Sequence, residues 1–257
     1  MDKSDSKMAL NSKVLIVAGT DPTGGAGIVR DIETTSHFGM KAALAVTSVN
    51  VQDDQRVEQK MPVTGSIIQG QMLAALKTNT IAAIKIGMTG SAPVVIGICE
   101  VLKQFPKIPV ILDPVITASS GGALADGETV MSIKHQLMQM SLLITPNLAE
   151  LAELSDSSLA KSHEEAIKHA QKLLDLGASH VLVKGGHEKS ETSVDSLVSH
   201  QSVIDFAFPR LNATMRGTGC TLSTAIACQL ALGKTLAQAI KEAKNYVYSL
   251  LELNQSA

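Results

Sequence analysis

The feature that most constrains the fold of this chain is a repeated alternation of short apolar runs with longer amphipathic segments. The runs are rich in β-branched and other apolar residues and are bounded by polar or turn residues, which is typical of buried strands; they cover residues 13–19, 41–51, 82–87, 108–113, 142–145 and 180–184. Between most of them, apolar residues recur three and four positions apart, which predicts helices over residues 28–38, 66–77, 92–105, 128–140 and 164–176. Such alternation predicts βαβ crossovers, and therefore an α/β fold with a mostly parallel sheet and helices on both faces.

The composition agrees with a sheet that is buried on both faces. Hydrophobic residues make up 45% of the chain and aromatic residues only 2%, so the core must be built from Val, Ile, Leu, Ala and Met, which favours α/β over a β-sandwich. The 257 residues are within the range of a single α/β domain, which we expect over residues 13–257 after a flexible segment over residues 1–12. We further expect an antiparallel hairpin within residues 193–208 and two closing helices over residues 218–232 and 236–251.

Charge and cysteine content argue against several classes of function. The formal net charge is −2 and no cluster of Lys and Arg exceeds a pair, so nucleic acid binding is not expected. No stretch approaches about 18 uninterrupted apolar residues, and residues 1–12 lack the features of a signal peptide, so neither a membrane span nor secretion is expected. Cys99, Cys220 and Cys228 are odd in number and lack C-x-x-C spacing, which favours a reducing, cytoplasmic location.

A glycine-rich segment follows the first predicted strand. Residues 19–27 read G-T-D-P-T-G-G-A-G and lead into a predicted helix. Glycines at such a turn let the backbone approach a ligand closely, and the helix start offers free N–H groups. The glycine spacing and Pro22 do not match the G-x-G-x-x-G of dinucleotide sites. The segment therefore predicts a ligand-binding turn, with a tight turn that binds nothing as the alternative.

A second glycine motif, R-G-T-G-C-T, occupies residues 216–221 and precedes an apolar helix. Its glycines and the helix start predict a cradle of backbone N–H groups for an anion, although the motif is not a Walker A loop. Cys220 falls in the first helical turn, where we expect the helix dipole to lower the pKa of the thiol and favour a proton acceptor. The alternative is a small buried residue at a helix start. Cys228, further along this helix, is expected in the core.

Three further strand ends carry polar side chains. Asp113 closes one predicted strand, and Lys184 closes another before two glycines. Asn147 and Glu150 follow a third strand, three residues apart and thus on one helical face. Carboxylate and amide oxygens are ligands that hydrated Mg²⁺ prefers, and a lysine can meet a phosphate. The local alternatives are a turn cap for the aspartate, a capping box for the Asn–Glu pair and a solvated side chain for the lysine.

All five motifs stand where the chain leaves a strand, and the carboxyl ends of parallel strands share one rim of the sheet. An anion cradle, oxygen ligands and a lysine on that rim suit Mg-ATP, whose transferring phosphoryl group needs charge neutralisation and positioning. The residues thus predict a kinase that transfers a phosphoryl group from ATP to the hydroxyl of a small molecule.

The set of motifs resembles, in order and spacing, the hydroxymethylpyrimidine/phosphomethylpyrimidine kinases of the ribokinase superfamily. The matching segments are Gln52 after a strand and G-T-D-P-T-G-G-A-G, I-K-I-G-M, L-D-P-V, T-P-N-x-x-E, K-G-G-H and G-T-G-C-T-L, spread over residues 14–251. The resemblance implies a ribokinase-like three-layer sandwich, ATP and Mg²⁺ as cofactors, and phosphorylation of a small pyrimidine in thiamin biosynthesis. It also implies a homodimer.

For individual residues, the resemblance divides the site into three parts. The substrate-binding residues would be Gly19, Asp21, Ala26, Gln52, Met88 and Val115. ATP would be bound by Asn147, Lys184, Gly186 and Thr218, with the metal ion near Asp113 and Glu150. The catalytic set would be an anion hole of Gly217, Thr218 and Gly219, with Cys220 at the position of an aspartate base in many superfamily relatives. This division is chemically sensible, because a planar heteroaromatic ring needs apolar faces and an amide at its polar edge.

Several residues depart from the pattern of that family. Arg216 stands where relatives commonly carry His, Asp53 and Asp54 replace the usual Asn-Thr after Gln52, and Ser119 stands where some relatives carry Lys or Thr. These positions border the substrate and phosphates, so they bear on the substrate more than on the fold. A pyridoxal or pyridoxine kinase of the same fold is therefore the alternative function, and a non-catalytic pyrimidine-binding regulatory protein is the second alternative.

Overall fold

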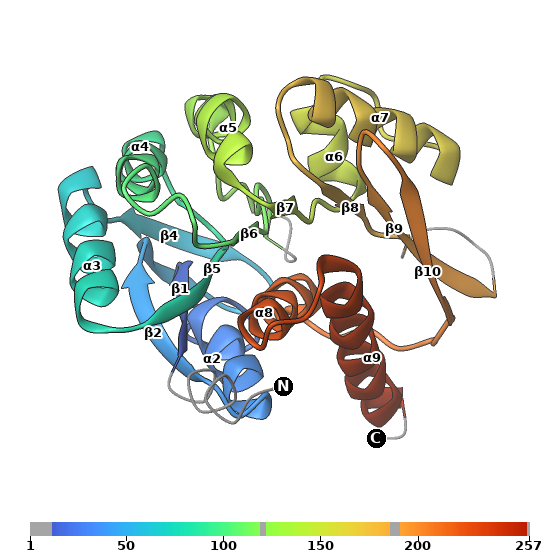
Figure 1. The fold of residues 1–257 in the computed structure, drawn as a ribbon, viewed down its shortest axis with the longest axis horizontal. Coiled ribbons are helices and arrows are strands. Elements are labelled where there is room, and N and C mark those ends of the chain that lie inside the picture. The colour runs from blue at the N-terminus through green and yellow to red at the C-terminus, as the bar shows by residue number, and fades with distance from the viewer. Residues whose placement is uncertain (1–11, 119–121, 186–190, 256–257) are drawn as a thin grey trace.

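The computed structural model describes residues 12–118, 122–185 and 191–255. Its centre is an eight-stranded sheet of order β10-β9-β8-β7-β6-β5-β1-β2 (Figure 1). The parallel strands are β1 (Lys13–Ala18), β2 (Lys41–Val46), β5 (Ile81–Ile86), β6 (Val110–Leu112), β7 (Leu143–Ile144) and β8 (Val181–Val183). At one edge, β9 (Thr192–Val198) and β10 (Val203–Pro209) continue the sheet antiparallel. The predicted mostly parallel sheet and the hairpin within residues 193–208 are confirmed; the flexible segment expected over residues 1–12 lies almost entirely outside the described residues.

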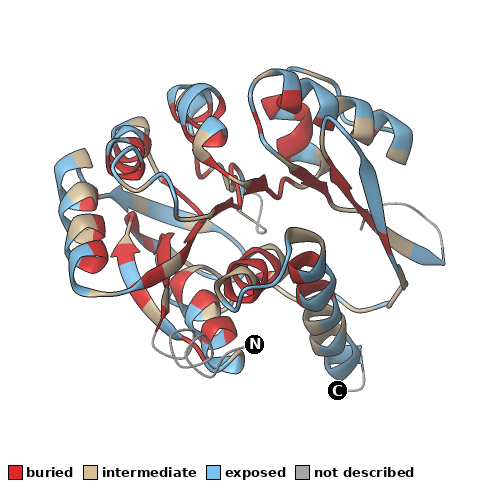
Figure 2. Ribbon diagram, viewed as in Figure 1, coloured by how far each residue is buried: buried red, intermediate tan, exposed pale blue. Residues whose placement is uncertain are grey.

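Helices cover both faces of this sheet, which confirms the three-layer α/β architecture (Figure 1). One layer consists of α3 (Gly65–Thr78), α4 (Ala92–Leu102), α5 (Gly127–Ser132), α6 (Leu148–Leu154) and α7 (His163–Asp175). The other layer consists of α2 (Gly27–His37), α8 (Thr218–Ala231) and α9 (Leu236–Gln255). Because a helix must bury its apolar stripe, each layer packs its buried side against one face of the strands and leaves its exposed side outward (Figure 2).

Most of the central strands read as apolar runs because both of their faces are buried. In β1, Leu15 and Val17 belong to the core under α3 and α4, whereas Val14 and Ile16 point to the opposite face, and all four side chains are fully buried. Successive side chains of a strand point to opposite faces, so a sheet covered on both sides needs apolar residues at every position.

The prediction of one strand over residues 41–51 is wrong, because the chain leaves the sheet at Thr47. The backbone N–H of Thr47 still donates to the carbonyl of Ala18, but β3 (Ser48–Gln52) then pairs with β4 (Val57–Pro62) in a separate antiparallel two-stranded sheet. Sequence reasoning missed β4, whose residues V-E-Q-K-M-P are mostly exposed and form no apolar run. The small sheet is joined to the main one through Thr47, between β2 and β3.

The helix predicted over residues 128–140 also differs in detail. It begins as α5, passes through a π-helical turn over Ile133–Leu137 and ends as a 3-10 turn over Met138–Met140. The N–H of Met138 donates to the carbonyl of Ile133, five residues earlier. This wider turn keeps both of those side chains on the buried face, each about 1% exposed.

The order of the strands creates a crevice at the carboxyl ends of β1 and β5. From β1 the chain moves outward to β2 on one side, and it later returns to β5 on the other side of β1. In open α/β sheets, ligands bind at such a switch point. Among the described residues, no helix combines the length and apolar composition needed to cross a membrane; the cytoplasmic location stays a prediction.

Candidate active site

A cavity of about 1220 Å³ opens at the carboxyl ends of the strands. It brings together every predicted site residue that the structure describes: Gly19, Asp21, Ala26, Gln52, Met88, Asp113, Val115, Asn147, Glu150, Lys184, Gly217, Thr218, Gly219 and Cys220. Gly186 lies outside the described residues. Small-molecule pockets usually measure about 300–1000 Å³, so this cavity is larger than most of them.

One end of the cavity is built around Gly19 and Met88, which follow β1 and β5. A Cβ on Gly19 would lie 2.9 Å from the sulfur of Met88 and 3.1 Å from the side-chain nitrogen of Asn50, so a larger residue there would displace these two side chains. Asn50 is 6% exposed and its amide donates to the carbonyl of Thr20 at 2.9 Å and to the Met88 sulfur at 3.3 Å. Asn50 therefore ties the two strand ends together.

Asn50 was missed by sequence reasoning, although the alternation within β3 indicates it. Asn50 and Gln52 are two residues apart and both line the cavity, whereas the alternate residues Val49 and Val51 are 54% and 47% exposed. A strand places alternate side chains on opposite faces, so a polar-apolar alternation marks one face for the cavity. The signal was hidden because residues 41–51 were interpreted as a single buried strand.

The predicted anion cradle lies at the start of α8. Gly217 is the N-cap, with a left-handed φ of 73°, and a Cβ there would lie 2.4 Å from the carbonyl oxygen of Gly25. The first intrahelical bond runs from the N–H of Thr221 to the carbonyl of Gly217. The N–H groups of the first turn thus have no acceptor within the helix, and with the helix dipole they form an anion-binding end.

The expectation that the helix start lowers the pKa of Cys220 is wrong. Burial raises the pKa of this thiol to about 11, although the positive charge of Lys85 and the backbone N–H of Gly27 act in the opposite direction. Desolvation of the thiolate outweighs both of these opposing effects. In the free protein at neutral pH, Cys220 is therefore a neutral thiol. Cys228 is fully buried in the core, as predicted.

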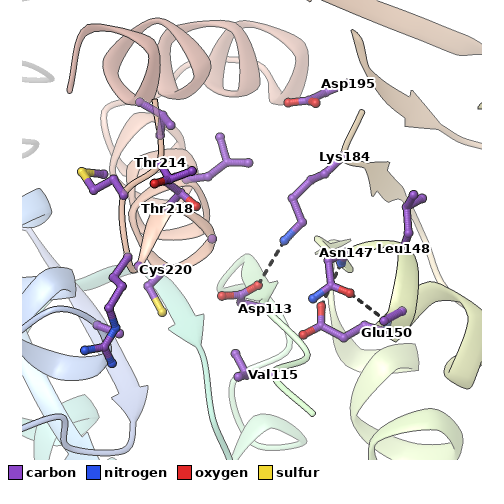
Figure 3. Close-up of a pocket in the computed structure, with 18 of the residues that line it drawn as sticks. Asp113, Val115, Asn147, Leu148, Glu150, Lys184, Asp195, Thr214, Thr218 and Cys220 are labelled. Atoms are coloured by element: carbon purple, nitrogen blue, oxygen red, sulfur yellow. Dashed lines mark hydrogen bonds and ion pairs between the residues drawn. The ribbon is translucent and has the colours of Figure 1, made fainter. Parts of the chain in front are cut away.

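Asp113 and Lys184 face each other across the middle of the cavity (Figure 3). The Nζ of Lys184 lies 3.7 Å from Oδ1 of Asp113, which also accepts a hydrogen bond of 3.2 Å from the hydroxyl of Thr145. A Cβ on Gly219 would lie 3.5 Å from Oδ2 of Asp113 and 3.6 Å from the Lys184 nitrogen. The cradle, a carboxylate and a cation thus converge on one point.

Asn147 and Glu150 form a capping box, which the sequence offered as the alternative to a pair of metal ligands (Figure 3). The N–H of Glu150 donates to Oδ1 of Asn147 at 2.9 Å, and the N–H of Asn147 donates to Oε2 of Glu150 at 2.8 Å. Both residues nevertheless line the cavity. Burial raises the pKa of Glu150 to about 7, with Lys184 lowering it and Asp113 raising it further.

The acids of the cavity fit a hydrated metal ion bound through phosphates. Within the described ranges, no cluster of three or more His, Cys, Asp or Glu forms a closed metal site. Asp113 and Glu150 instead offer buried carboxylates beside Lys184 and the cradle. Mg²⁺ keeps several waters and is commonly held by one or two carboxylates plus substrate phosphates. Two carboxylates beside a phosphate-binding site are therefore a suitable set of protein ligands for it.

Arg216, the unusual residue before the cradle, joins three segments at the cavity mouth. Its guanidinium donates to Oδ2 of Asp21 at 3.3 Å and to the hydroxyl of Thr23 at 3.2 Å, and it forms an ion pair with Asp54. Asp21 is 3% exposed, whereas the Asp54 side chain is 75% exposed. Arg216 thus connects the cradle to the glycine-rich turn and to the end of β3.

The loop that carries Lys184 is supported by two residues that sequence reasoning also missed. Asp195 in β9 accepts a hydrogen bond of 2.9 Å from the N–H of Gly185 and pairs with Lys244 of α9 at 3.0 Å. Burial lowers the pKa of Lys244, with Asp195 opposing that change. No local motif marks either residue, because the pairing depends on how α9 packs against the hairpin.

Comparisons with known proteins agree with this geometry. The family model described as phosphomethylpyrimidine kinase matches residues 21–257. A Rhizobium meliloti protein named hydroxymethylpyrimidine/phosphomethylpyrimidine kinase is 35% identical over 92% of this chain and 89% of the relative. The crystal structure of a Clostridium difficile phosphomethylpyrimidine kinase superposes with a TM-score of 0.82 at 30% identity, covering 93% of this chain and 99% of that one. A Staphylococcus aureus pyridoxal kinase in complex with pyridoxal gives a TM-score of 0.84 at 28% identity, covering 93% and 88%. The predicted resemblance is confirmed: this chain belongs to the phosphomethylpyrimidine kinase family.

Proposed function

We propose that this protein transfers a phosphoryl group from ATP to the hydroxyl of 4-amino-5-hydroxymethyl-2-methylpyrimidine, and a second one to the resulting monophosphate. The observation that carries the proposal is a single cavity with an anion cradle, a lysine and buried acids at its centre and a glycine-lined pocket at one end. The names of the relatives support the substrate assignment. The proposal requires the acceptor at the pocket end and ATP at the other end.

At the pocket end, the ring of the substrate lies between apolar side chains. Met88 and Val115 pack against its faces, and the amide of Gln52 pairs with its amino edge. Gly19, Asp21 and Ala26 border the ring, where small residues and backbone let it approach closely. Asn50 holds the two strand ends at the spacing that this contact needs.

At the other end, the chain offers groups for Mg-ATP. Lys184 meets the phosphates as a point charge, Asn147 and Thr218 contact them, and the sequence adds Gly186. Asp113 and Glu150 would hold Mg²⁺, which supplies charge neutralisation on the phosphate oxygens when bound. Aromatic and apolar residues of β10 and α9, including Phe208 and Tyr248, line the far wall and suit the adenine ring.

The transfer itself depends on the cradle. The backbone N–H groups at Gly217, Thr218 and Gly219 donate to the oxygens of the transferring phosphoryl group and stabilise the charge that develops on them. The thiolate form of Cys220, a small fraction at neutral pH because burial raises the pKa to about 11, accepts the proton of the attacking hydroxyl. Because the transition state is loose, this proton moves late, and the high pKa of the neutral thiol makes the step dependent on pH.

The alternative function is a pyridoxal kinase, because solved pyridoxal kinases share the fold at 28% identity. An assay of ADP release with the pyrimidine alcohol, its monophosphate and pyridoxal separates the two. We expect kcat/KM to be highest for the pyrimidines. Preference for pyridoxal would refute the pyrimidine assignment, and no ADP release with any acceptor would favour the non-catalytic binding protein.

Gln52 provides a second test of the substrate. Gln52→Ala should lower kcat/KM for the pyrimidine alcohol by about tenfold or more, because the variant leaves the amino edge of the ring without its hydrogen-bonding partner. Gln201→Ala is the control, since Gln201 is exposed in the turn between β9 and β10 and does not line the cavity. Equal kcat/KM for the two variants would remove the role proposed for Gln52.

We also propose that the protein is a homodimer formed through the β3–β4 sheet. Val49, Val51 and Met61 are exposed by 54%, 47% and 58%, and Val49 lies directly opposite Met61. A two-stranded sheet is marginally stable by itself, and an apolar outer face is suited to a second copy of the chain. Light scattering should give a dimer for the wild type and for the control Met131→Lys, whose methionine is 54% exposed on α5, and a monomer for Met61→Lys. A monomeric wild type would exclude this interface.

A further inference from the structure

Behind the cradle lies an ion pair that the proposed chemistry does not use. The Nζ of Lys85 in β5 donates to both carboxylate oxygens of Asp31 in α2, at 2.7 and 2.9 Å, and both side chains are completely buried. Oδ1 of Asp31 also accepts a hydrogen bond of 2.7 Å from the hydroxyl of Thr224 in α8, which is buried as well. A cation, an anion and a hydroxyl from three different elements thus form one closed network.

Such a network is not explained by stability. Taking two charges out of water costs free energy that their attraction often fails to recover, and apolar residues of similar volume are frequently as stable. Burial by itself would lower the pKa of Lys85, but the charges of Asp31, Cys220 and Asp113 and the hydrogen bond to Asp31 together outweigh it and hold the ammonium protonated. A charged pair at this place therefore indicates a functional role, either in positioning the elements around it or in supplying a charge to the site.

The three elements are those that build the reacting centre. The helix of Asp31 follows the glycine-rich turn at the substrate end, the strand of Lys85 leads directly into Gly87 and Met88, and the helix of Thr224 begins with the anion cradle. A Cβ on Gly87 would lie 2.8 Å from Nζ of Lys85, so the ammonium lies against the backbone where β5 ends. Lys85 lines the floor of the cavity together with Cys220.

We propose that Lys85, Asp31 and Thr224 are positioning residues for phosphoryl transfer: they hold the cradle of α8 against the substrate-binding turn and place the charge of Lys85 beneath Cys220. The inference rests on the proposed function. Hydrogen-bond donors stabilise a transition state most strongly when they need no reorganisation during the reaction, and even a small displacement of these donors lowers the rate. The electrostatics agree, because Lys85 lowers and Asp31 raises the pKa of the Cys220 thiol, after the larger effect of burial.

The link between α2 and α8 is tested by Thr224→Val, which removes one hydroxyl and keeps the ion pair. We expect kcat to fall about tenfold, with KM for ATP and for the acceptor within about twofold of wild type. Thr224→Ser should restore kcat, because it keeps the donor to Asp31. Thr34→Val is the matched control: it removes a buried hydroxyl that donates to the carbonyl of Arg30 in its own helix and interacts with Tyr246 of α9, but belongs to no part of the network. The proposal fails if Thr224→Val and Thr34→Val have the same kcat.

The charge of Lys85 is tested without any substrate, by the rate at which iodoacetamide alkylates Cys220, followed on its peptide by mass spectrometry. Lys85→Met should slow alkylation at pH 8 and Asp31→Asn should accelerate it, because the two charges act on the thiolate in opposite directions. A network that only stabilises the fold would expose the thiol and accelerate alkylation in both variants, and that result would overturn the proposal. Since this measurement needs no acceptor, it distinguishes failure of the network from failure of the proposed reaction. If Lys85→Met or Asp31→Asn does not fold, the kcat values of the Thr224 variants and of Thr34→Val test the proposal instead.

Discussion

Gly217→Ala tests whether the backbone cradle at the start of α8 carries the phosphoryl transfer. Gly217 has a left-handed φ of 73°, which costs a residue with a Cβ about 1–2 kcal/mol. The new Cβ would also lie 2.4 Å from the carbonyl oxygen of Gly25, and that neighbour is backbone and cannot rotate away. To restore an ordinary contact, the helix N-terminus must move by about 1 Å, a displacement that can reduce the rate of a positioned reaction by about 10²-fold.

Gly233→Ala is the matched control, because Gly233 ends the same helix with a φ of 84° and a Cβ there meets nothing within 4 Å. Urea unfolding should show that both variants lose about 1–2 kcal/mol from the left-handed conformation, with a further loss for Gly217→Ala from the close contact. In an ADP-release assay at saturating ATP and acceptor, only Gly217→Ala should lose about 10²-fold in kcat. If folded Gly217→Ala turns over within about twofold of Gly233→Ala, the cradle is not the catalytic element.

Three further predictions concern charges around the cavity. Because the pKa of Cys220 is raised to about 11, a proton-accepting thiol should make kcat/KM rise about tenfold per pH unit between pH 7 and 9, and Cys220→Ser should lose this slope; a flat wild-type profile would exclude the base. Because the folded-state pKa of Glu150 is raised from 4.5 to about 7, ionising it opposes folding, so between pH 5 and 8 the unfolding free energy in urea should fall more for the wild type than for Glu150→Gln, and equal losses would contradict the raised pKa. Arg216→Gln should raise KM for the monophosphate about tenfold more than KM for the alcohol, because the guanidinium beside the cradle is the charge that a second phosphate would meet, whereas its contact with Asp21 bears on both substrates. Arg56→Gln, which removes an exposed arginine of the region between β3 and β4, is the control, and an equal rise in both KM values for Arg216→Gln would contradict selection of the phosphate.

Much of the fold was predictable because its signals are local. The apolar runs of β1, β6 and β8 require a sheet that is covered on both faces, and connected parallel strands place their carboxyl ends on one rim. That single geometric consequence is enough to bring Gly19, Asp113 and Lys184 into one cavity. The small β3–β4 sheet escaped prediction because β4 has no apolar periodicity and because the chain changes direction at Thr47 without glycine or proline.

The sequence by itself determined the order of the motifs, the need for glycine at the turns and the rim at which the functional groups collect, because these depend on local backbone geometry and on residue period. Only the tertiary structure decided the state of those groups. Whether the thiol of Cys220 is acidic or neutral depends on how deeply α8 is buried, and burial reversed the direction that the helix start implied. Lys85 and Asp31 are 54 residues apart, and Thr224 is 193 residues from Asp31, so no local pattern connects them. Burial and long-range charge act through space rather than along the chain, and they set the chemistry of the site.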